Sequence, residues 1–178
     1  MIRLEFRLAQ NQDVEAVVGL VNSAYRGESS RRGWTTEADL LGGQRTDARE
    51  ITSLLRPPDS LLVLGYGDGQ LLACFHLQHE HAAVSLGLFA IDPRRQGEGL
   101  GRQCLSHAES LARQRWLAGT MRMTVISERS ELIAYYQRKG YELTGEREPF
   151  PMRDERFGLP KVEHLEFVVL EKPLAETG

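Results

Sequence analysis

Long hydrophobic runs, a cysteine framework and an excess of one charge are all missing from this 178-residue sequence. The longest apolar runs, at residues 61–64 and 86–91, are far shorter than the roughly 20 residues that a membrane-spanning helix needs. The two cysteines, Cys74 and Cys104, cannot build a disulfide framework, and they are expected to be small core residues. The net charge of −3 argues against a general nucleic-acid binder. We therefore expect neither a membrane nor a nucleic acid as partner.

The N-terminal residues 2–7 alternate charged and apolar side chains, so they lack the apolar core of a signal peptide. The sequence also contains no Asn-x-Ser/Thr glycosylation site. From these absences we expect a cytoplasmic protein. We expect one domain over residues 1–178, because a chain of this length can bury a full core.

Hydrophobic periodicity predicts helices and strands that alternate along the chain. Val14, Val17 and Val21 lie on one face of a helix that is expected from Asp13 to about Tyr25. Further helices are expected at residues 36–42, 51–55, 100–116 and 130–139. Strands are expected at residues 2–8, 61–66, 71–78, 84–91, 121–126, 141–145 and 162–170, with a loop over residues 146–161. This order predicts a mixed α/β fold around one sheet.

Glycine is the residue in excess: there are 17, about one residue in ten, against an average of about 7%. Gly97, Gly99 and Gly101 lie between an expected strand and an expected helix. Such glycines let the backbone approach a ligand and aim N–H groups into one concavity, and the helix N-terminus adds partial positive charge. Nearby arginines add full charges: Arg94, Arg95 and Arg102. The segment therefore predicts a phosphate or pyrophosphate cradle, although a glycine cluster also fits a plain turn.

Two common phosphate loops do not match this segment. A Walker loop ends in Gly-Lys-Ser/Thr, whereas here Gly101 is followed by Arg102 and Gln103. A dinucleotide fingerprint places its third glycine where Arg102 stands.

Two motifs resemble the GNAT superfamily of N-acetyltransferases. Gln96-x-x-Gly99-x-Gly101 is similar to its signature Gln/Arg-x-x-Gly-x-Gly/Ala, and Tyr136-x-x-x-Gly140-Tyr141 is similar to its Tyr-x-x-x-Gly-Phe/Tyr ending. Their order and spacing also fit, and the resemblance covers residues 61–145. It implies a GNAT-like acyl-CoA N-acyltransferase fold, with a single mixed, mostly antiparallel central sheet flanked by helices.

The resemblance implies acetyl-CoA as the acyl donor, bound where two neighbouring strands splay apart, and no metal. Backbone groups of Phe89, Ala90 and Ile91 would bind the pantetheine arm and the acetyl carbonyl. The pyrophosphate would lie against the backbone N–H groups of Gln96, Gly97, Glu98, Gly99, Leu100, Gly101 and Arg102.

Tyr136 matches the tyrosine that commonly protonates the departing CoA thiolate in this family. Acyl transfer needs such a general acid, because a thiolate leaves when the amine has attacked. The periodicity also allows a core aromatic here, since Leu132, Ile133 and Tyr136 share one helix face. The family often has an asparagine seven residues earlier, and this sequence has Arg129 there.

The general base is left open by the sequence. Its candidates are Glu37, His79, Glu80 and His81, and each also fits a solvated strand end or helix start. The three histidines at positions 76, 79 and 81 do not predict zinc, because His76 lies on the opposite strand face and no fourth ligand completes the set.

The acceptor is expected to be a primary amine of a small molecule or peptide. In the family the first helices and their loop form one wall of the acceptor pocket, which places Tyr25, Trp34 and Glu37 near the substrate. The loop over 146–161, which includes Phe150, would form the opposite wall or a homodimer contact. Two alternatives to an N-acetyltransferase are a non-catalytic acyl-CoA-binding module and an enzyme that transfers a longer acyl group.

Overall fold

The computed structural model describes residues 2–26, 41–42, 44–150, 159–161 and 165–175. The strands are β1 (Glu5–Leu8), β2 (Leu41–Gly42), β3 (Ser60–Gly67), β4 (Gln70–Glu80), β5 (Ala83–Ile91), β6 (Thr120–Ile126), β7 (Glu142–Pro149), β8 (Leu159–Pro160) and β9 (Glu166–Pro173). The helices are α1 (Val14–Tyr25), α3 (Ala48–Leu54), α4 (Leu100–Trp116) and α5 (Ser130–Arg138), with 3-10 turns at Asn11–Asp13 and Pro93–Arg95.

Seven strands form one mixed sheet in the order β1-β3-β4-β5-β6-β9-β7. All neighbours pair antiparallel except β5 and β6, which are parallel because the long helix α4 connects them. This confirms the expected fold class of a mixed, mostly antiparallel sheet flanked by helices. β2 and β8 pair separately.

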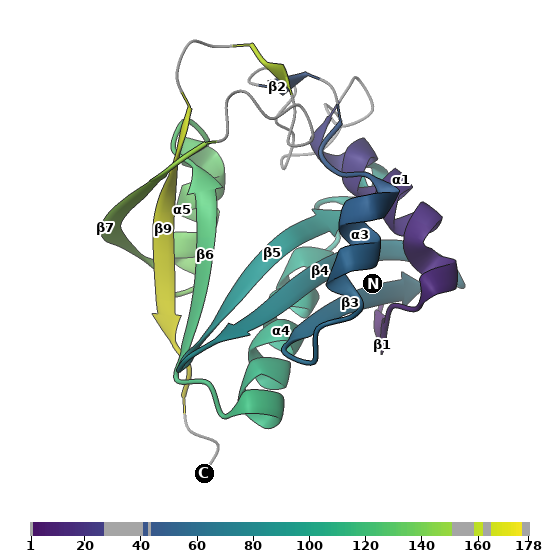
Figure 1. Cartoon of the computed structure of the whole chain (residues 1–178), viewed down its shortest axis with the longest axis horizontal. Helices are drawn as coiled ribbons and strands as arrows, with labels where there is room; N and C mark the ends of the chain where they lie inside the picture. The colour runs from purple at the N-terminus through teal and green to yellow at the C-terminus, as the bar shows by residue number, and fades with distance from the viewer. Residues whose placement is uncertain (1, 27–40, 43, 151–158, 162–164, 176–178) are drawn as a thin grey trace.

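The parallel pair β5–β6 is short, and the two strands then separate. Their pairing begins at Ala83 and Thr120 and ends at Leu86 and Met123, although both strands continue beyond that point. Figure 1 shows β5 and β6 adjacent at one end and diverging toward the other, so the sheet has the outline of a V. The backbone groups of residues 87–91 that would have paired with β6 therefore face a gap.

A β-bulge in β5 lies at the start of this gap. Cys74 of β4 pairs with Ala90, and His76 pairs with Gly87, so Phe75 faces both Leu88 and Phe89. Leu88 has φ +46°, in the left-handed region that a leucine rarely adopts. This conformation costs on the order of 1–3 kcal/mol. Burial of the Leu88 side chain, which is 8% exposed, offsets the strain.

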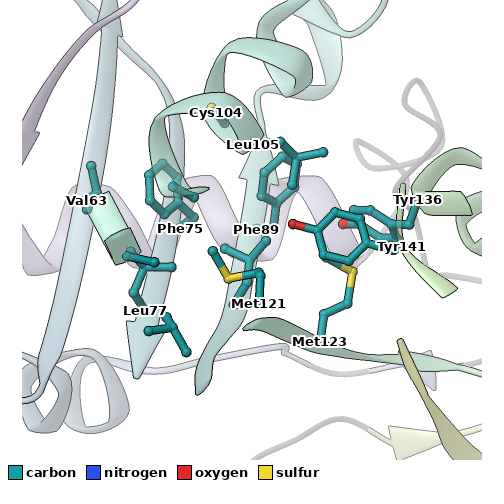
Figure 2. Packing of buried hydrophobic residues seen from close by; sticks show 14 of the residues in the cluster. Val63, Phe75, Leu77, Phe89, Cys104, Leu105, Met121, Met123, Tyr136 and Tyr141 are labelled. Atoms are coloured by element: carbon teal, nitrogen blue, oxygen red, sulfur yellow. The ribbon is translucent and has the colours of Figure 1, made fainter. Parts of the chain in front are cut away.

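Two hydrophobic layers cover the two faces of the sheet. On one face, α4 and α5 pack on a large cluster that includes Phe75, Phe89 and Tyr136. Figure 2 shows this cluster, with Phe89, Tyr136 and Tyr141 grouped beside Met123. On the opposite face, α1 and α3 pack on a smaller cluster drawn from β3, β4 and β5. Because both faces of β5 are buried, its near-continuous apolar sequence matches a central strand.

Three predicted segments need correction. Residues 146–149 and 159–160, expected in a loop, belong to the strands β7 and β8. The last strand reaches Pro173, not residue 170. Every side chain of β7 is exposed and most are polar or charged, so its backbone pairing with β9 carries no hydrophobic signal. The helix expected over 36–42 lies mostly outside the described residues, and its end, Leu41–Gly42, is the strand β2.

No helix among the described residues combines the length and apolar character that crossing a membrane requires.

His76 is a partly buried titratable group in β4. The single Ser60 hydroxyl proton is donated to the Leu54 carbonyl at 2.8 Å, and the Ser60 oxygen shares a 2.6 Å hydrogen bond with Nε2 of His76. Burial lowers the pKa of His76 to about 4. Since an unfolded chain would bind a proton at about pH 6.5, acidification between these values favours unfolding.

We expect the free energy of unfolding to fall as the pH is lowered from about 6.5 to 4, with up to about 1.4 kcal/mol per pH unit due to His76. The variant H76Q should lose this component, so urea unfolding at a series of pH values should give a shallower curve for it. The control is H81N, at an exposed position with φ +55° that asparagine tolerates. Parallel curves for H76Q and the unsubstituted protein would contradict the assignment.

Candidate active site

The predicted cradle, residues 96–102, connects the end of β5 to α4. Asp92 first caps a 3-10 turn by accepting the backbone N–H of Arg94 at 2.9 Å, and it binds the Arg94 guanidinium. Gly97 has φ +89° and Gly99 has φ +79°, so both need the freedom of glycine. Gly99 is the N-cap of α4 and makes no side-chain capping bond. The first N–H groups of this 17-residue helix therefore point out of its N-terminus, as an anion site requires.

A pocket of about 580 Å³ lies over the cradle. Seven of the predicted cofactor residues line it: Ile91, Gln96, Gly97, Gly99, Leu100, Gly101 and Arg102. Gly101 faces α5, because a Cβ there would lie 3.0 Å from the Tyr135 hydroxyl. Because Gly101 has no Cβ, space remains in the pocket beside the Tyr135 hydroxyl.

The opposite side of the cradle pocket is formed by α5 and its end, which the sequence analysis missed. The additional lining residues are Glu131, Ala134, Tyr135, Arg138 and Lys139. Lys139 lies with its ammonium 5.5 Å from the centre of the Tyr135 ring. With Arg102, the cations of α5 place positive charge on both sides of the pocket, which suits a pyrophosphate. The sequence signal that could have identified the α5 lining residues is their spacing from Tyr136 on the same helix.

The other three predicted cofactor residues lie elsewhere. Phe89 lines the neighbouring cavity described below, and Ala90 packs in the cluster on the α1 face of the sheet. The carboxylate of Glu98 is 3.1 Å from Nε of Arg95, so its side chain is held by an ion pair. The roles predicted for these residues belong to their backbone groups, and those roles remain predictions.

A second cavity, of about 230 Å³, lies where β5 and β6 diverge; we call it the inter-strand cavity. Apolar side chains from both strands and from α5 form much of its wall, and Phe150 and Phe167 close one side. Phe150 belongs to the segment 146–161, which was expected to form a wall of the acceptor pocket, and it lines the inter-strand cavity. The polar groups of this cavity come from Tyr25, Tyr136, Thr124 and the arginines discussed below.

Tyr136, the predicted general acid, lines the inter-strand cavity from α5. Its side chain is 5% exposed and packs edge-on against the rings of Phe89 and Tyr141. Burial raises the pKa of Tyr136 well above its usual range, and the nearby Tyr25 raises it further. The phenol is therefore protonated at neutral pH, as a proton donor must be. Tyr136 thus lines the cavity, as the general-acid prediction requires, and it is also buried in the aromatic core, as the alternative prediction requires.

Tyr25, predicted to contact the substrate, ends α1 and lines the same cavity. Its hydroxyl donates a hydrogen bond to the carbonyl of Phe89. This bond satisfies a backbone group of β5 beyond its pairing with β6, and it ties α1 to the bulge. Trp34 and Glu37, the other two predicted acceptor residues, lie outside the described residues.

Three arginines, Arg26, Arg45 and Arg129, also line the inter-strand cavity, and the sequence analysis assigned none of them to the acceptor. The guanidinium carbons of Arg45 and Arg129 each lie 5.8 Å from the centre of the Tyr25 ring. They come from segments far apart in the sequence, so no local motif signals them.

Of the candidate bases, His79, Glu80 and His81 do not line the inter-strand cavity with Tyr136. His79 stacks on Trp116, with ring centres 5.2 Å apart. Glu80 and His81 line a separate groove at the β4–β5 hairpin, which adjoins the inter-strand cavity through Leu86. Within the described part of the chain, no three His, Cys, Asp or Glu side chains gather as metal ligands.

The model of the acetyltransferase (GNAT) family matches residues 16–141, which is more than half of the chain. The chain therefore belongs to the GNAT acetyltransferase family, and membership supports acyl transfer as its general activity. No curated protein matches it.

Solved structures share the fold at low sequence identity. The ribosomal-protein-S18-alanine N-acetyltransferase from Escherichia coli is 17% identical with a TM-score of 0.71, over 99% of this chain and 97% of that one. An N-acetyltransferase from Staphylococcus aureus is 13% identical with a TM-score of 0.71, over 97% and 98%. A GNAT family acetyltransferase from Elizabethkingia anophelis with acetyl-CoA bound is 15% identical with a TM-score of 0.57, over 71% and 82%.

We predict that G101E abolishes CoA binding while the chain still folds. A glutamate there places a carboxylate in the cradle pocket and repels the pyrophosphate, whereas an acidic residue in the first turn of α4 favours the helix. Isothermal titration with CoA and a circular dichroism melt measure the two effects. G119E is the matched control, because Gly119 is exposed, lies beyond the opposite end of α4 and has open space at its Cβ. Micromolar CoA affinity in G101E would disprove the placement.

Proposed function

We propose that this protein transfers the acetyl group of acetyl-CoA to a primary amine of a small molecule or peptide, by direct attack in a ternary complex. The observation that carries the proposal is the position of Tyr136. It lines the inter-strand cavity, while its neighbour in sequence, Tyr135, lines the cradle pocket. A donor bound over the cradle and reaching the cavity would pass along α5 between these two tyrosines.

The residues present fit acetyl-CoA as the donor. Three basic side chains and the N-terminus of α4 line the cradle pocket, against one acidic side chain, Glu131. The lack of a Cβ at Gly101 leaves room beside Tyr135. The unpaired edge of β5 beyond Leu86 offers backbone groups to an extended pantetheine arm. Acetyl-CoA supplies an activated thioester.

In the transfer step, the amine nitrogen forms a bond to the thioester carbonyl carbon and the carbon–sulfur bond breaks. The Tyr136 hydroxyl gives its proton to the departing sulfur, and the proton lost by the amine restores the phenol. The bulge supports this chemistry, because the Phe89 carbonyl is held by the Tyr25 hydroxyl and the adjoining backbone is thereby fixed. Pre-oriented N–H groups at such a position stabilise a developing oxyanion.

Two alternatives share the same binding site. The first is a non-catalytic acyl-CoA-binding module; it is favoured by the composition of the inter-strand cavity, whose described lining residues include no carboxylate or histidine to act as base. The second is transfer of a longer acyl group, for which the apolar wall of the cavity offers contacts. CoA release from acetyl-CoA and longer acyl-CoA donors, with a panel of primary amines, separates all three.

For the general acid, we expect Y136F to lower kcat with the best amine by about 10²–10⁴-fold, because the proton donor for the thiolate is lost. The measurement is the steady-state rate of CoA release, and CoA affinity should be unchanged. Y141F is the matched control: Tyr141 is 1% exposed in the same aromatic cluster, but it does not line the inter-strand cavity. Equal rates for Y136F and the unsubstituted protein would rule out the general-acid role.

The raised pKa of Tyr136 also predicts the pH profile. An acid whose pKa lies well above 10 remains protonated throughout the neutral and mildly alkaline range, so it adds no alkaline loss of activity there. We expect kcat to rise with pH as the amine deprotonates, with no alkaline fall through the neutral and mildly alkaline range. A fall in kcat between pH 7 and 9, in protein that circular dichroism shows to be folded, would contradict this.

A further inference from the structure

A polar groove of about 620 Å³, which we call the hairpin groove, continues from the inter-strand cavity over β4, β5 and β6. The two spaces share four lining residues, two from each of the diverging strands: Leu86, Gly87, Met123 and Thr124. These residues lie where the pairing of β5 with β6 ends. The cavity and the groove are therefore contiguous, and we call the place where they meet the junction.

His76 of β4 lies at the junction, because it is the register partner of Gly87. Partner residues of an antiparallel pair project from the same face of the sheet, and Gly87 has no side chain that could cover the imidazole. A Cβ at Gly87 would meet no atom within 4 Å, so the space beside His76 is open there. His76 itself lines the hairpin groove.

The hydrogen bonds of Ser60 fix the tautomer of His76. Because Ser60 donates its only hydroxyl proton to the Leu54 carbonyl, the 2.6 Å bond between Ser60 Oγ and Nε2 of His76 needs a proton on Nε2. Burial lowers the pKa of His76 to about 4, so the ring is neutral at neutral pH and Nδ1 carries a lone pair. No donor among the described residues binds Nδ1. The junction therefore contains a neutral hydrogen-bond acceptor whose position is fixed by Ser60.

The remaining lining of the hairpin groove offers further hydrogen-bonding groups. Arg122 is already held by carboxylates, at 2.6 Å from Glu146 and 3.1 Å from Glu171, so the groove presents no free arginine. Amide and hydroxyl side chains both donate and accept hydrogen bonds, as an extended peptide backbone requires of a partner. The groove has four of them: Gln78, Ser85, Thr120 and Thr124.

We propose that the acceptor is the N-terminus of a peptide, whose amine lies in the inter-strand cavity and whose backbone extends into the hairpin groove, where Nδ1 of His76 accepts a hydrogen bond from a peptide N–H. This rests on the proposed function for the amine and narrows the acceptor to one class. The cavity, at about 230 Å³, has the volume of about eight waters, and the groove adds that of about twenty. The joined space is therefore larger than a single amino acid requires.

A matched peptide series tests the hydrogen bond in the unsubstituted protein. The parent is the tripeptide amide X-Ala-Ala-NH2, in which X is the best of all natural N-terminal residues, and the short reference is X-NH2. Two analogues each replace one peptide N–H by an ester oxygen, which removes a donor and adds no bulk. We expect the parent to exceed X-NH2 in kcat/KM by about 10-fold, and one ester to lose about 3- to 10-fold, the range of a neutral hydrogen bond. Equal values for all four compounds would overturn the proposal.

Two variants separate a binding role of His76 from a structural one. The amide of H76Q reaches the position of Nε2 and keeps a donor for Ser60, whereas the amide of H76N reaches the position of Nδ1 and keeps an acceptor at the junction. We expect H76Q to raise the KM of the parent peptide about 3- to 10-fold, to have no effect on the sensitive ester, and H76N to stay close to the unsubstituted protein. The reverse order, with H76N impaired and H76Q unaffected, would assign His76 to the bond with Ser60 alone and overturn the proposal. If H76N does not fold in circular dichroism, an equal effect of H76Q on peptide and ester would overturn it.

A binding measurement keeps the peptide site separate from the proposed function. Calorimetric titration of the CoA-loaded protein with the same series needs no turnover. If no amine releases CoA but the parent peptide binds and one ester binds more weakly, the proposed function fails and the peptide site stands. If X-NH2 and simple amines are acetylated as efficiently as the peptide, the peptide site is overturned and the proposed function is not.

Discussion

The early end of the β5–β6 pairing is the constraint on which the rest of the site depends. After Leu86 and Met123 the two strands no longer share hydrogen bonds, so the backbone of β5 must find other partners. The Phe89 carbonyl accepts from the Tyr25 hydroxyl, and the Leu88 carbonyl lies 3.5 Å from the Cys74 sulfur. These contacts stabilise the bulge, and the separation of the strands makes room for the inter-strand cavity. Without the divergence, Tyr136 would face only the core.

A net charge of −3 is compatible with the proposed anionic donor, because positive charge is concentrated locally at the cradle. At the cradle, the N-terminus of α4 supplies partial positive charge through backbone N–H groups, and Arg102 and Lys139 add side-chain charge. The cradle is a local arrangement, so the overall charge has little influence on it.

The part of the site that could be predicted from the sequence is the part encoded locally. The cradle follows from three glycines between one strand and one helix, and the structure gives two of them left-handed backbone angles. The lining contributed by α5 and the three arginines could not be predicted in this way, because their positions depend on how distant segments pack. The same reason explains β7, whose exposed side chains carry no periodic signal although its backbone pairs with β9.

The sequence by itself determined the order of the main elements, the central position of β5 and the glycine-rich connection to α4 on which the predicted phosphate cradle rests, because apolar spacing and glycine placement act within a few residues of one another. It also indicated the family, through two short motifs that the match over residues 16–141 bears out. Only the tertiary structure decided that β5 and β6 separate, that Tyr25 of α1 reaches Phe89, and that Arg26, Arg45 and Arg129 meet at one cavity. These are contacts between residues far apart in the chain, and packing of α1 and α5 against the sheet is the physical step that brings them together.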